Sequence, residues 1–344
     1  MSGDALNLFE QQARNRRQTA WWIFLFVLFF AWIGFGGDAV MYFGSFDKYG
    51  QAHYTVPWIG IVVTAIAAIV ARTSWTRGPK RVLWSAGAVE LTNPQTFEEK
   101  QLVNVVEEMA IAAGLPRPKV YVVNDPDPNA FATGHGPETA SIAVTSGLIQ
   151  ALNREELQGV VGHEMAHVRN LDVRLMTMVA ALVGVIVVLS DGIGRVMRGG
   201  GGRGVGALVG GRGRRSGGGA GMIAIVLLVL WLITLILAPL ITRLMAMAIS
   251  RKREFLADAT SAELTRNPGA LASALQKIEA APAPTASMKR GTAHLCIADP
   301  LGSSANLKEG RLADLFGTHP PMAKRITILR GMAFQQAKAT APQP

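Results

Sequence analysis

The chain has 344 residues, of which 49% are hydrophobic and 17% are charged, and it carries a formal net charge of +10. Long apolar runs account for the hydrophobic excess, so a membrane protein is the first class to consider. The Lys and Arg residues flank these runs and are not interleaved with aromatic side chains, so membrane topology explains the charge and we expect no nucleic-acid partner. The single cysteine, Cys296, excludes an intramolecular disulfide and a cysteine-built metal site.

The first two apolar runs span residues 20–36 and 56–71. The first run is long for a signal-peptide core and no clear small-residue cleavage site follows it, so we expect an uncleaved transmembrane helix. Basic residues precede the first run and follow the second, whereas the loop between the runs is nearly free of them. The positive-inside rule therefore predicts that the N-terminus and the chain after Arg72 lie in the cytoplasm.

Residues 73–160 have the pattern of a small α+β unit. A helix is predicted from Asn93-Pro94 to about Gly114. Alternating apolar residues and turn signals predict three strands, at 119–123, 129–133 and 141–145. An exposed edge of such a sheet could hold an extended peptide through main-chain hydrogen bonds. A hairpin that only completes the core is an equally good interpretation of any one strand.

The motif HEMAH at residues 163–167 lies in a segment with a helical pattern that begins at about Arg154. His163 and His167 are four residues apart, so both imidazoles project from one face of a helix and can bind a single ion. Neutral imidazoles suit Zn²⁺, and three protein ligands with one water make a catalytic zinc site. Glu164 would point beside that ion, where it could take a proton from the water.

Two further apolar runs follow, at residues 175–193 and 222–241, on either side of a Gly/Arg-rich tract at 195–221. A spanning hairpin would place the arginines of this tract outside the cell, against the positive-inside rule. The two runs either span the membrane, which we favour, or form a re-entrant or surface-lying hairpin. Both arrangements return the chain, at Arg251, to the side of the membrane where the HEMAH motif lies.

Two carboxylates follow Arg251 and lie on one face of a predicted helix, because Glu254 and Asp258 are four residues apart. If this helix runs antiparallel to the motif helix, Glu254 falls level with the two histidines and becomes the third metal ligand. Asp258 would then accept a hydrogen bond from the second ring nitrogen of a ligand histidine. The alternative is an exposed acidic pair that offsets the basic residues just before it.

Two side chains near the C-terminus could stabilise an oxyanion. His319 precedes two prolines, and Arg325 lies in a predicted final helix. Either side chain could donate a hydrogen bond to a tetrahedral transition state. From the residues alone, a packed loop histidine is the better interpretation of His319.

Five segments in this order resemble the signatures of the HtpX family of integral-membrane zinc metalloproteases, which is related to the CAAX prenyl proteases. They are residues 129–134 (NAFATG), 144–148 (VTSGL), 162–172 (GHEMAHVRNLD), 250–258 (SRKREFLAD) and 318–321 (THPP). The similarity covers most of the chain from residue 20 to about 331. The Gly/Arg-rich tract and a Pro/Ala-rich stretch near residue 282 look like expansions of the family pattern.

The resemblance implies a gluzincin-like fold with a cytoplasmic active site, in a multi-pass protein of the cell (inner) membrane that acts in membrane-protein quality control and stress response. By position, the family's zinc ligands correspond to His163, His167 and Glu254. Its general base and acid correspond to Glu164, and its ligand-supporting carboxylate to Asp258. By position, the residues that would contact substrate are the transition-state helper His319 and the edge strand Asn129, Ala130, Phe131 and Ala132; to these we add Arg325 from the residue pattern alone.

We therefore expect an α+β membrane protein that is mainly helical, with a small β-sheet and four transmembrane or membrane-associated helices. The expected parts are a membrane hairpin (1–72), a first peptidase segment (73–172), a second membrane hairpin (173–249) and a second peptidase segment (250–344). The expected function is zinc-dependent cleavage, with one Zn²⁺ per chain, of misfolded or damaged membrane proteins. The alternatives are a non-catalytic zinc-binding scaffold, a CAAX-type processing protease, and a channel or transporter, which the lack of ionisable residues in the apolar runs disfavours.

Overall fold

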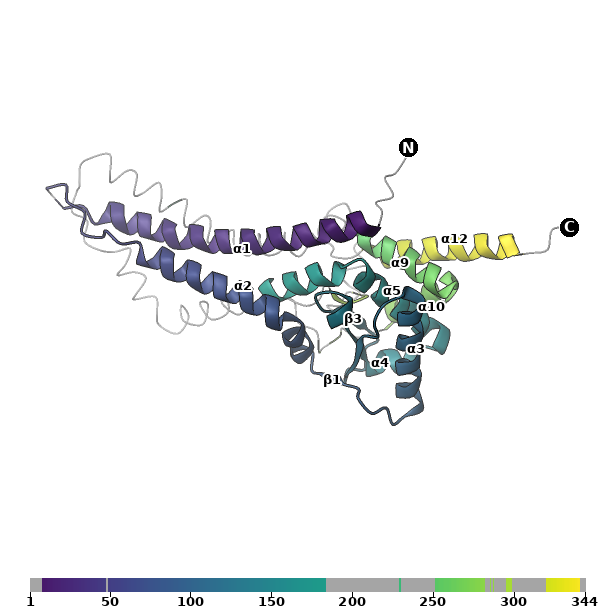
Figure 1. The fold of residues 1–344 in the computed structure, drawn as a ribbon. Helices are drawn as coiled ribbons and strands as arrows, with labels where there is room; N and C mark the ends of the chain where they lie inside the picture. The colour runs from purple at the N-terminus through teal and green to yellow at the C-terminus, as the bar shows by residue number, and fades with distance from the viewer. Residues whose placement is uncertain are drawn as a thin grey trace. The chain divides into compact units, whose positions relative to one another are not determined.

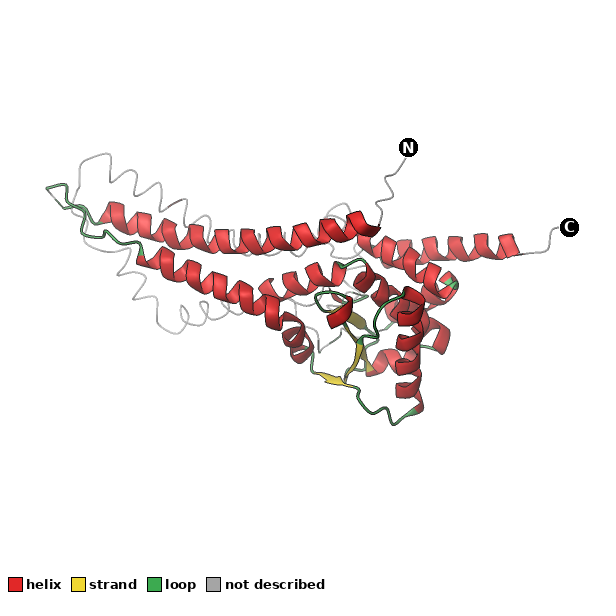
Figure 2. Cartoon of the chain, in the orientation of Figure 1, coloured by secondary structure: helices red, strands yellow, loops and turns green. Residues whose placement is uncertain are grey.

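The computed structural model describes residues 8–47, 49–183, 229, 251–281, 285, 287, 295–298 and 320–340. These residues belong to two compact units. The first unit takes in the described residues within Met1–Thr19, Arg77–Ala181 and Ala246–Pro344, and the second takes in those within Ala20–Thr76 and Leu182–Met245. The described part is mainly helical, with a small sheet in the first unit, as Figures 1 and 2 show.

The sheet has four strands in the order β1-β2-β4-β3. The strands are β1 (Ala88–Glu90), β2 (Lys119–Val123), β3 (Ala130–Thr133) and β4 (Ser141–Thr145). β2 and β4 are parallel, whereas β1 pairs with β2 and β3 pairs with β4 in antiparallel fashion. The strands predicted at 119–123 and 141–145 are found at those residues, and the one predicted at 129–133 begins one residue later. The short β1 was not predicted. The order places β3 at an edge of the sheet.

The helix that carries the HEMAH motif is α5 (Arg154–Arg169), and it begins with a capping box. Asn153 accepts a hydrogen bond from the backbone N–H of Glu156, and the Glu156 carboxylate accepts one from the backbone N–H of Asn153. Glu156 also accepts hydrogen bonds from Ser273 and Lys277 on α10 (Pro268–Glu279). Burial alone would raise the pKa of Glu156, but the hydrogen bonds with Lys277, Ser273 and Asn153 outweigh it and lower that pKa. The start of α5 is therefore tied to α10.

Three helices pack around α5: α3 (Phe97–Ala113), α9 (Arg251–Thr265) and α10. Two glycines let these neighbours approach α5. A Cβ on Gly159 would lie 2.9 Å from Leu271 Cα, and one on Gly162 would lie 2.9 Å from Ser261 Oγ. The Ser261 hydroxyl donates a hydrogen bond to the Gly159 carbonyl at 2.7 Å. This close approach brings α9 alongside the motif helix.

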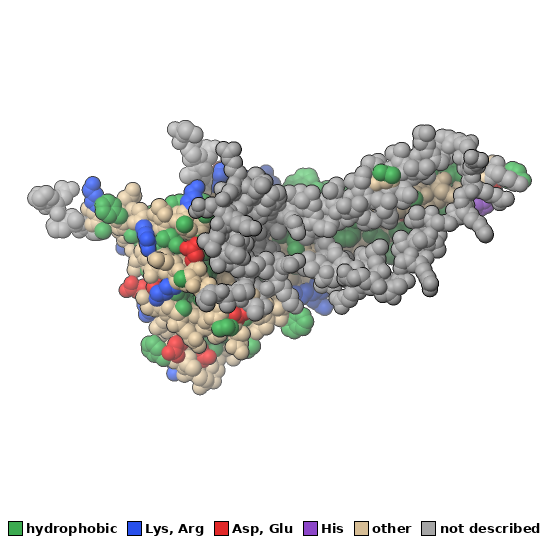
Figure 3. Space-filling model, turned by 180° about the vertical axis from the view of Figure 1, so that it is seen from behind, with side chains coloured by type: hydrophobic (Ala, Val, Ile, Leu, Met, Phe, Trp, Pro, Cys, Tyr) green, Lys and Arg blue, Asp and Glu red, His purple; other side chains and the backbone are tan. Residues whose placement is uncertain are grey.

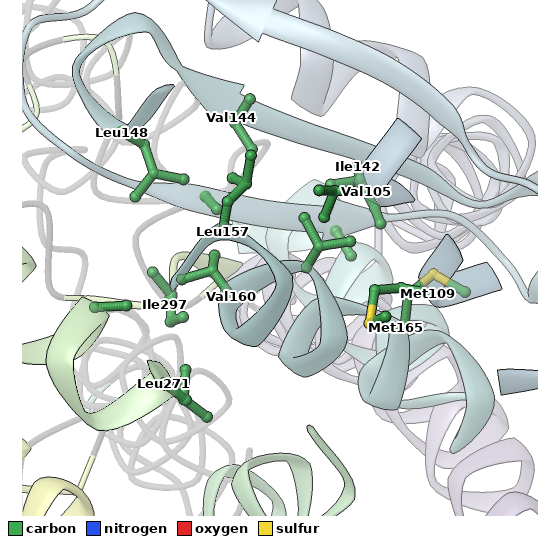
Figure 4. Close-up of a cluster of buried hydrophobic side chains, with 14 of the residues drawn as sticks. Val105, Met109, Ile142, Val144, Leu148, Leu157, Val160, Met165, Leu271 and Ile297 are labelled. Atoms are coloured by element: carbon green, nitrogen blue, oxygen red, sulfur yellow. The ribbon is translucent and has the colours of Figure 1, made fainter. Parts of the chain in front are cut away.

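The hydrophobic core of the first unit lies between the sheet and these helices, as Figure 4 shows. It joins Val105 and Met109 of α3, Ile142 of β4, and Val160 and Met165 of α5. These core contacts fix α5, including Met165 of the motif, and so hold the two histidines of the motif in place. This unit also contains α4 (Ser146–Ala151) and α12 (Met322–Thr340), and α12 packs against α9 and α10.

The second unit contains the long apolar parts of α1 (Leu8–Gly44) and α2 (Trp58–Ser85). Among the described helices, these two are long and apolar enough to cross a membrane. Inside this unit, Asp38 is buried and accepts hydrogen bonds from Tyr54 and from the backbone N–H groups of Ile59 and Gly60 at the start of α2. The predicted membrane segment 20–36 lies within α1, and the predicted segment 56–71 begins two residues before α2 and otherwise lies within it.

Charged side chains gather over the described part of the first unit in the face shown in Figure 3. By contrast, α1 and α2 expose large apolar side chains, including Trp21, Phe24, Trp32, Ile66 and Ile69. Such an apolar surface is expected of a segment that contacts lipid. Of the other predicted membrane segments, residues 175–183 are helical, while 184–193, the Gly/Arg-rich tract and 222–241 apart from residue 229 lie outside the described residues.

Candidate metal centre

Two histidines of α5 and one glutamate of α9 meet in the interior of the first unit. His163 Nε2 and His167 Nε2 are 3.2 Å apart. Each of these nitrogens lies 3.5 Å from an oxygen of Glu254. All three side chains are buried. The antiparallel approach of α5 and α9 that the sequence required is thus present, and it places the three predicted ligands together.

The spacing of the two imidazole nitrogens and the Glu254 carboxylate fits a tetrahedral zinc ion. Ligand bonds of about 2.0–2.1 Å with tetrahedral angles separate neighbouring ligand atoms by about 3.3 Å. The two nitrogens are 3.2 Å apart, and each lies 3.5 Å from a different oxygen of Glu254, Oε2 for His163 and Oε1 for His167. Two imidazole nitrogens and one carboxylate are also a ligand set that catalytic zinc sites use, with the fourth position left for water or substrate. The side chains present therefore fit this ion.

The imidazole of His163 is oriented from behind by Asp258 and Arg325. Asp258 Oδ1 lies 2.9 Å from His163 Nδ1, so this nitrogen carries the proton and the Nε2 lone pair is free for a metal. Arg325 of α12 donates two hydrogen bonds to Asp258, at 2.9 and 2.7 Å. Burial would raise the pKa of Asp258, but the Arg325 guanidinium outweighs it and holds that pKa at about 2. Asp258 therefore stays ionised.

A second carboxylate supports His167, and its role was not predicted. Asp172 Oδ2 lies 3.4 Å from His167 Nδ1. Asp172 Oδ1 accepts a 2.8 Å hydrogen bond from Asn15, on the part of α1 that belongs to the first unit, and lies 3.1 Å from the Arg253 guanidinium. Asn15 also donates to the Asn170 carbonyl at 2.8 Å. The signal in the sequence was the five-residue spacing from His167 to Asp172, but a lone Asp at that distance has many possible roles.

We expect Asp172→Asn to weaken metal binding about 10–100-fold, the usual effect of losing a carboxylate behind a ligand histidine. The substitution keeps the shape of the side chain but removes the charge that favours a proton on His167 Nδ1. Competition with a chromophoric chelator measures the affinity. Asp47→Asn, in the connection between α1 and α2, removes the same charge elsewhere and should bind metal normally. Equal affinities for the two variants would exclude this role for Asp172.

Glu164 adjoins the three ligands and lies next to strand β3. Its side chain is 1% exposed, and burial raises the pKa of its carboxyl above the ordinary value, an effect that the two nearby histidines and a hydrogen bond with the Ala132 backbone reduce. Among the described residues, no group forms a hydrogen bond with Glu164 Oε1. A buried carboxylate oxygen without a protein partner needs a water or a substrate group beside it. Within the part of the chain that the structure describes, Glu164 thus has an acceptor oxygen without a partner beside the three candidate ligands.

The predicted substrate strand, Asn129–Ala132, is found along the edge of the sheet, but part of that edge already has a partner. The Ala130 carbonyl accepts a 2.9 Å hydrogen bond from the Ile297 N–H, and Phe131 pairs with Cys296 in an antiparallel bridge. Neither contact was predicted from the sequence. Arg325 was expected to contact substrate, and it donates to the Ile297 carbonyl at 3.0 Å while it also holds Asp258. His319 lies outside the described residues.

The site combines an HExxH helix, a carboxylate from a second helix as the candidate third ligand, and a buried glutamate beside them. This combination is typical of the HExxH metallopeptidases. Residues 96–333 match peptidase family M48, and the chain belongs to that family. It is therefore a metallopeptidase with two candidate membrane helices, and the family implies a metal, typically zinc. The resemblance to HtpX and the expected enzyme class are both confirmed.

Two similar proteins are named as HtpX proteases. The chain is 43% identical over 328 residues to a protease HtpX homolog of Caldanaerobacter subterraneus subsp. tengcongensis, covering 95% of this chain and 98% of that protein. It is 40% identical to a protease HtpX homolog of Streptococcus gordonii, covering 94% of this chain and all of that protein. Among solved structures, Ste24p of S. mikatae matches with a TM-score of 0.42 and 17% identity, over 86% of this chain and 62% of that one.

Proposed function

We propose that the protein is a membrane-bound zinc endopeptidase that hydrolyses peptide bonds of polypeptides at the cytoplasmic face of the membrane. The single observation that carries this proposal is the convergence of His163, His167 and Glu254 beside the buried, partly unpartnered Glu164. His163, His167 and Glu254 would hold the zinc ion. When bound, zinc supplies Lewis acidity that polarises a water and the scissile carbonyl.

The protein side chains then perform the proton transfers. Glu164 Oε1 accepts a proton from the attacking water, and the same carboxyl returns it to the departing amine. Burial favours this exchange because it raises the pKa of Glu164 toward the operating pH. Asp258 keeps the proton of His163 on Nδ1, and Asp172 does the same for His167, so both imidazoles present their Nε2 atoms to the metal. His319 remains our candidate for an oxyanion donor.

Misfolded or damaged membrane proteins are the substrates that we propose. β3 is an edge strand, and an extended, unfolded segment, unlike a folded one, could pair with its main chain once the contacts of residues 296 and 297 with that edge are released. Two candidate membrane helices in the same chain would keep the enzyme at the bilayer. The basic residues that flank these helices favour the cytoplasmic side of the cell membrane for both the N-terminus and the peptidase unit. A structural zinc site does not require a general base. The buried Glu164, whose Oε1 has no hydrogen-bond partner among the described residues, therefore favours an enzyme over a zinc-binding scaffold.

Removal of the metal tests this proposal. We expect the detergent-purified protein to cleave an unfolded polypeptide, to lose the activity after treatment with a chelator, and to regain it when zinc is added back. The double variant H163A/H167A should be inactive at every zinc concentration, and Mg²⁺ should not restore activity because it prefers six oxygen ligands. Cleavage that continues at full rate in protein shown to be free of metal would overturn the assignment.

A further inference from the structure

Residues 295–298 lie along the edge of β3 that faces away from β4. The Ile297 N–H donates to the Ala130 carbonyl at 2.9 Å, and Cys296 stands opposite Phe131 in an antiparallel bridge. β4 occupies the other side of β3 throughout its length. A peptide that adds a strand to a sheet must use the main-chain groups of the free edge. Residues 296 and 297 therefore use the groups that a substrate would need.

Two polar side chains hold the carbonyl groups of the same segment. Arg325 donates to the Ile297 carbonyl at 3.0 Å, and Asn129 donates to the Ala298 carbonyl at 3.3 Å. Arg325 also lies 3.5 Å from Glu254, one of the three proposed metal ligands. Arg325 thus links the segment to the metal centre, and the backbone donors and acceptors of residues 297 and 298 are bound by β3, Asn129 and Arg325.

The side chain of Ile297 is buried among apolar side chains of the hydrophobic core, and we call the space that it fills the Ile297 pocket. This side chain is 1% exposed, and Figure 4 shows it beside Val160 of α5, with Leu271 of α10 nearby. Val160 lies three residues, almost one helical turn, before His163. A pocket this close to a metal ligand can hold the side chain of a residue next to a scissile bond. Its walls are aliphatic, so they favour a branched aliphatic side chain such as that of Ile297.

We propose that residues 296–298 are a built-in pseudosubstrate: they occupy the substrate strand position along β3, and a polypeptide substrate displaces them and places a medium-sized aliphatic side chain in the Ile297 pocket. This inference rests on the proposed function, because it takes β3 as the strand that binds substrate. The substrate class is then an unfolded chain with Ile, Leu or Val at this position. While the segment occupies the edge, no substrate can bind there. The apparent affinity for every substrate is therefore reduced in proportion to the time that the edge is free.

A disulfide that locks the segment in place tests this proposal. Cys296 is the single cysteine of the chain, and residues that face each other across an antiparallel bridge have Cα atoms about 4.5–5.5 Å apart, which a disulfide can span. In Phe131→Cys, oxidised glutathione should join the introduced thiol to Cys296, and mass spectrometry of a digest identifies the bond. We expect peptidase activity to fall at least tenfold on oxidation and to return on reduction with a phosphine. Phe131→Ser carried through the same treatment is the control.

The outcomes separate this inference from the proposed function. A locked protein that cleaves as fast as the reduced one would show that the segment is a permanent part of the fold, and absence of the bond would show that it does not pair with β3; both overturn the proposal. A reduced variant and a wild type that are zinc-loaded yet inactive would instead refute the proposed function.

A second variant keeps the test open if Phe131→Cys does not fold. Ile297→Ala weakens the hold of the segment on its pocket, so we expect KM for an unfolded substrate with Leu or Ile to fall about threefold or more with little change in kcat. A purely structural segment predicts the opposite, an unchanged or higher KM and a lower rate. A peptide with the sequence of residues 294–299 should also inhibit Ile297→Ala competitively, and the same peptide with Asp in place of Ile should not.

Discussion

Replacement of Glu164 by Gln is expected to lower the peptidase rate by about 10²–10⁴-fold, the contribution of a positioned general base, while zinc stays bound. The amide has nearly the same shape as the carboxyl and can still accept the hydrogen bond from the Ala132 backbone N–H. Glu164 is not one of the three candidate metal ligands, His163, His167 and Glu254. The variant loses only the ability to take a proton at Oε1, so kcat should fall and the metal content should not.

The matched control is Glu155→Gln, on the first turn of the same helix. Glu155 is exposed, and its carboxylate accepts a hydrogen bond from Asn267 and reaches no residue of the metal centre. This control should keep both its metal and its activity. Zinc content measured by atomic absorption and the initial rate of cleavage must be determined on the same preparation of each variant. Full activity in zinc-loaded Glu164→Gln would exclude Glu164 as the base.

Local pattern was sufficient to predict the helices that carry the metal centre. The i, i+4 spacing of His163 and His167 needs only the geometry of one helix, and the same spacing relates Glu254 to Asp258. The convergence of the two pairs required a long-range assumption, an antiparallel return of the chain, and the packing of α5 against α9 agrees with it. The roles of these residues, as ligands and base, remain predictions until metal binding is measured.

Contacts between distant segments could not be predicted, because no local pattern encodes them. Asn15 and Asp172 are 157 residues apart, and their hydrogen bond depends on how the start of α1 packs in the first unit. The edge position of β3 was expected only from the family resemblance. The residues alone did not indicate it, because successive strands usually pair with each other, yet β2 pairs with β4 and leaves β3 outside. Residues 296–298 lie in a stretch without apolar periodicity, so nothing in the sequence indicated that Ile297 is buried.

Replacement of Glu254 by Ala should remove the metal. The carboxylate supplies one of the three ligand atoms, and two imidazoles alone leave the ion with half of a tetrahedral shell. The loss of affinity should exceed the 10–100-fold that an orienting carboxylate contributes. We therefore expect less than one-tenth of a zinc ion per chain after dialysis, no peptidase activity, and loss of the increase in Tm that added zinc gives to the wild type, because that increase requires binding to the folded state.

Two further variants separate the loss of a ligand from the loss of packing. Glu254→Gln keeps the volume of the side chain beside Arg325 but replaces the anionic ligand by a neutral amide, so it should also fail to retain zinc. Glu263→Ala removes an exposed carboxylate from the same helix and should behave as the wild type in all three measurements. If Glu254→Ala retains one tightly bound zinc per chain, the third ligand lies elsewhere and α9 only packs against the histidine helix. If Glu254→Gln retains zinc and Glu254→Ala does not, the side chain of residue 254 acts through its shape and hydrogen bonds. Its negative charge is then not needed for zinc binding.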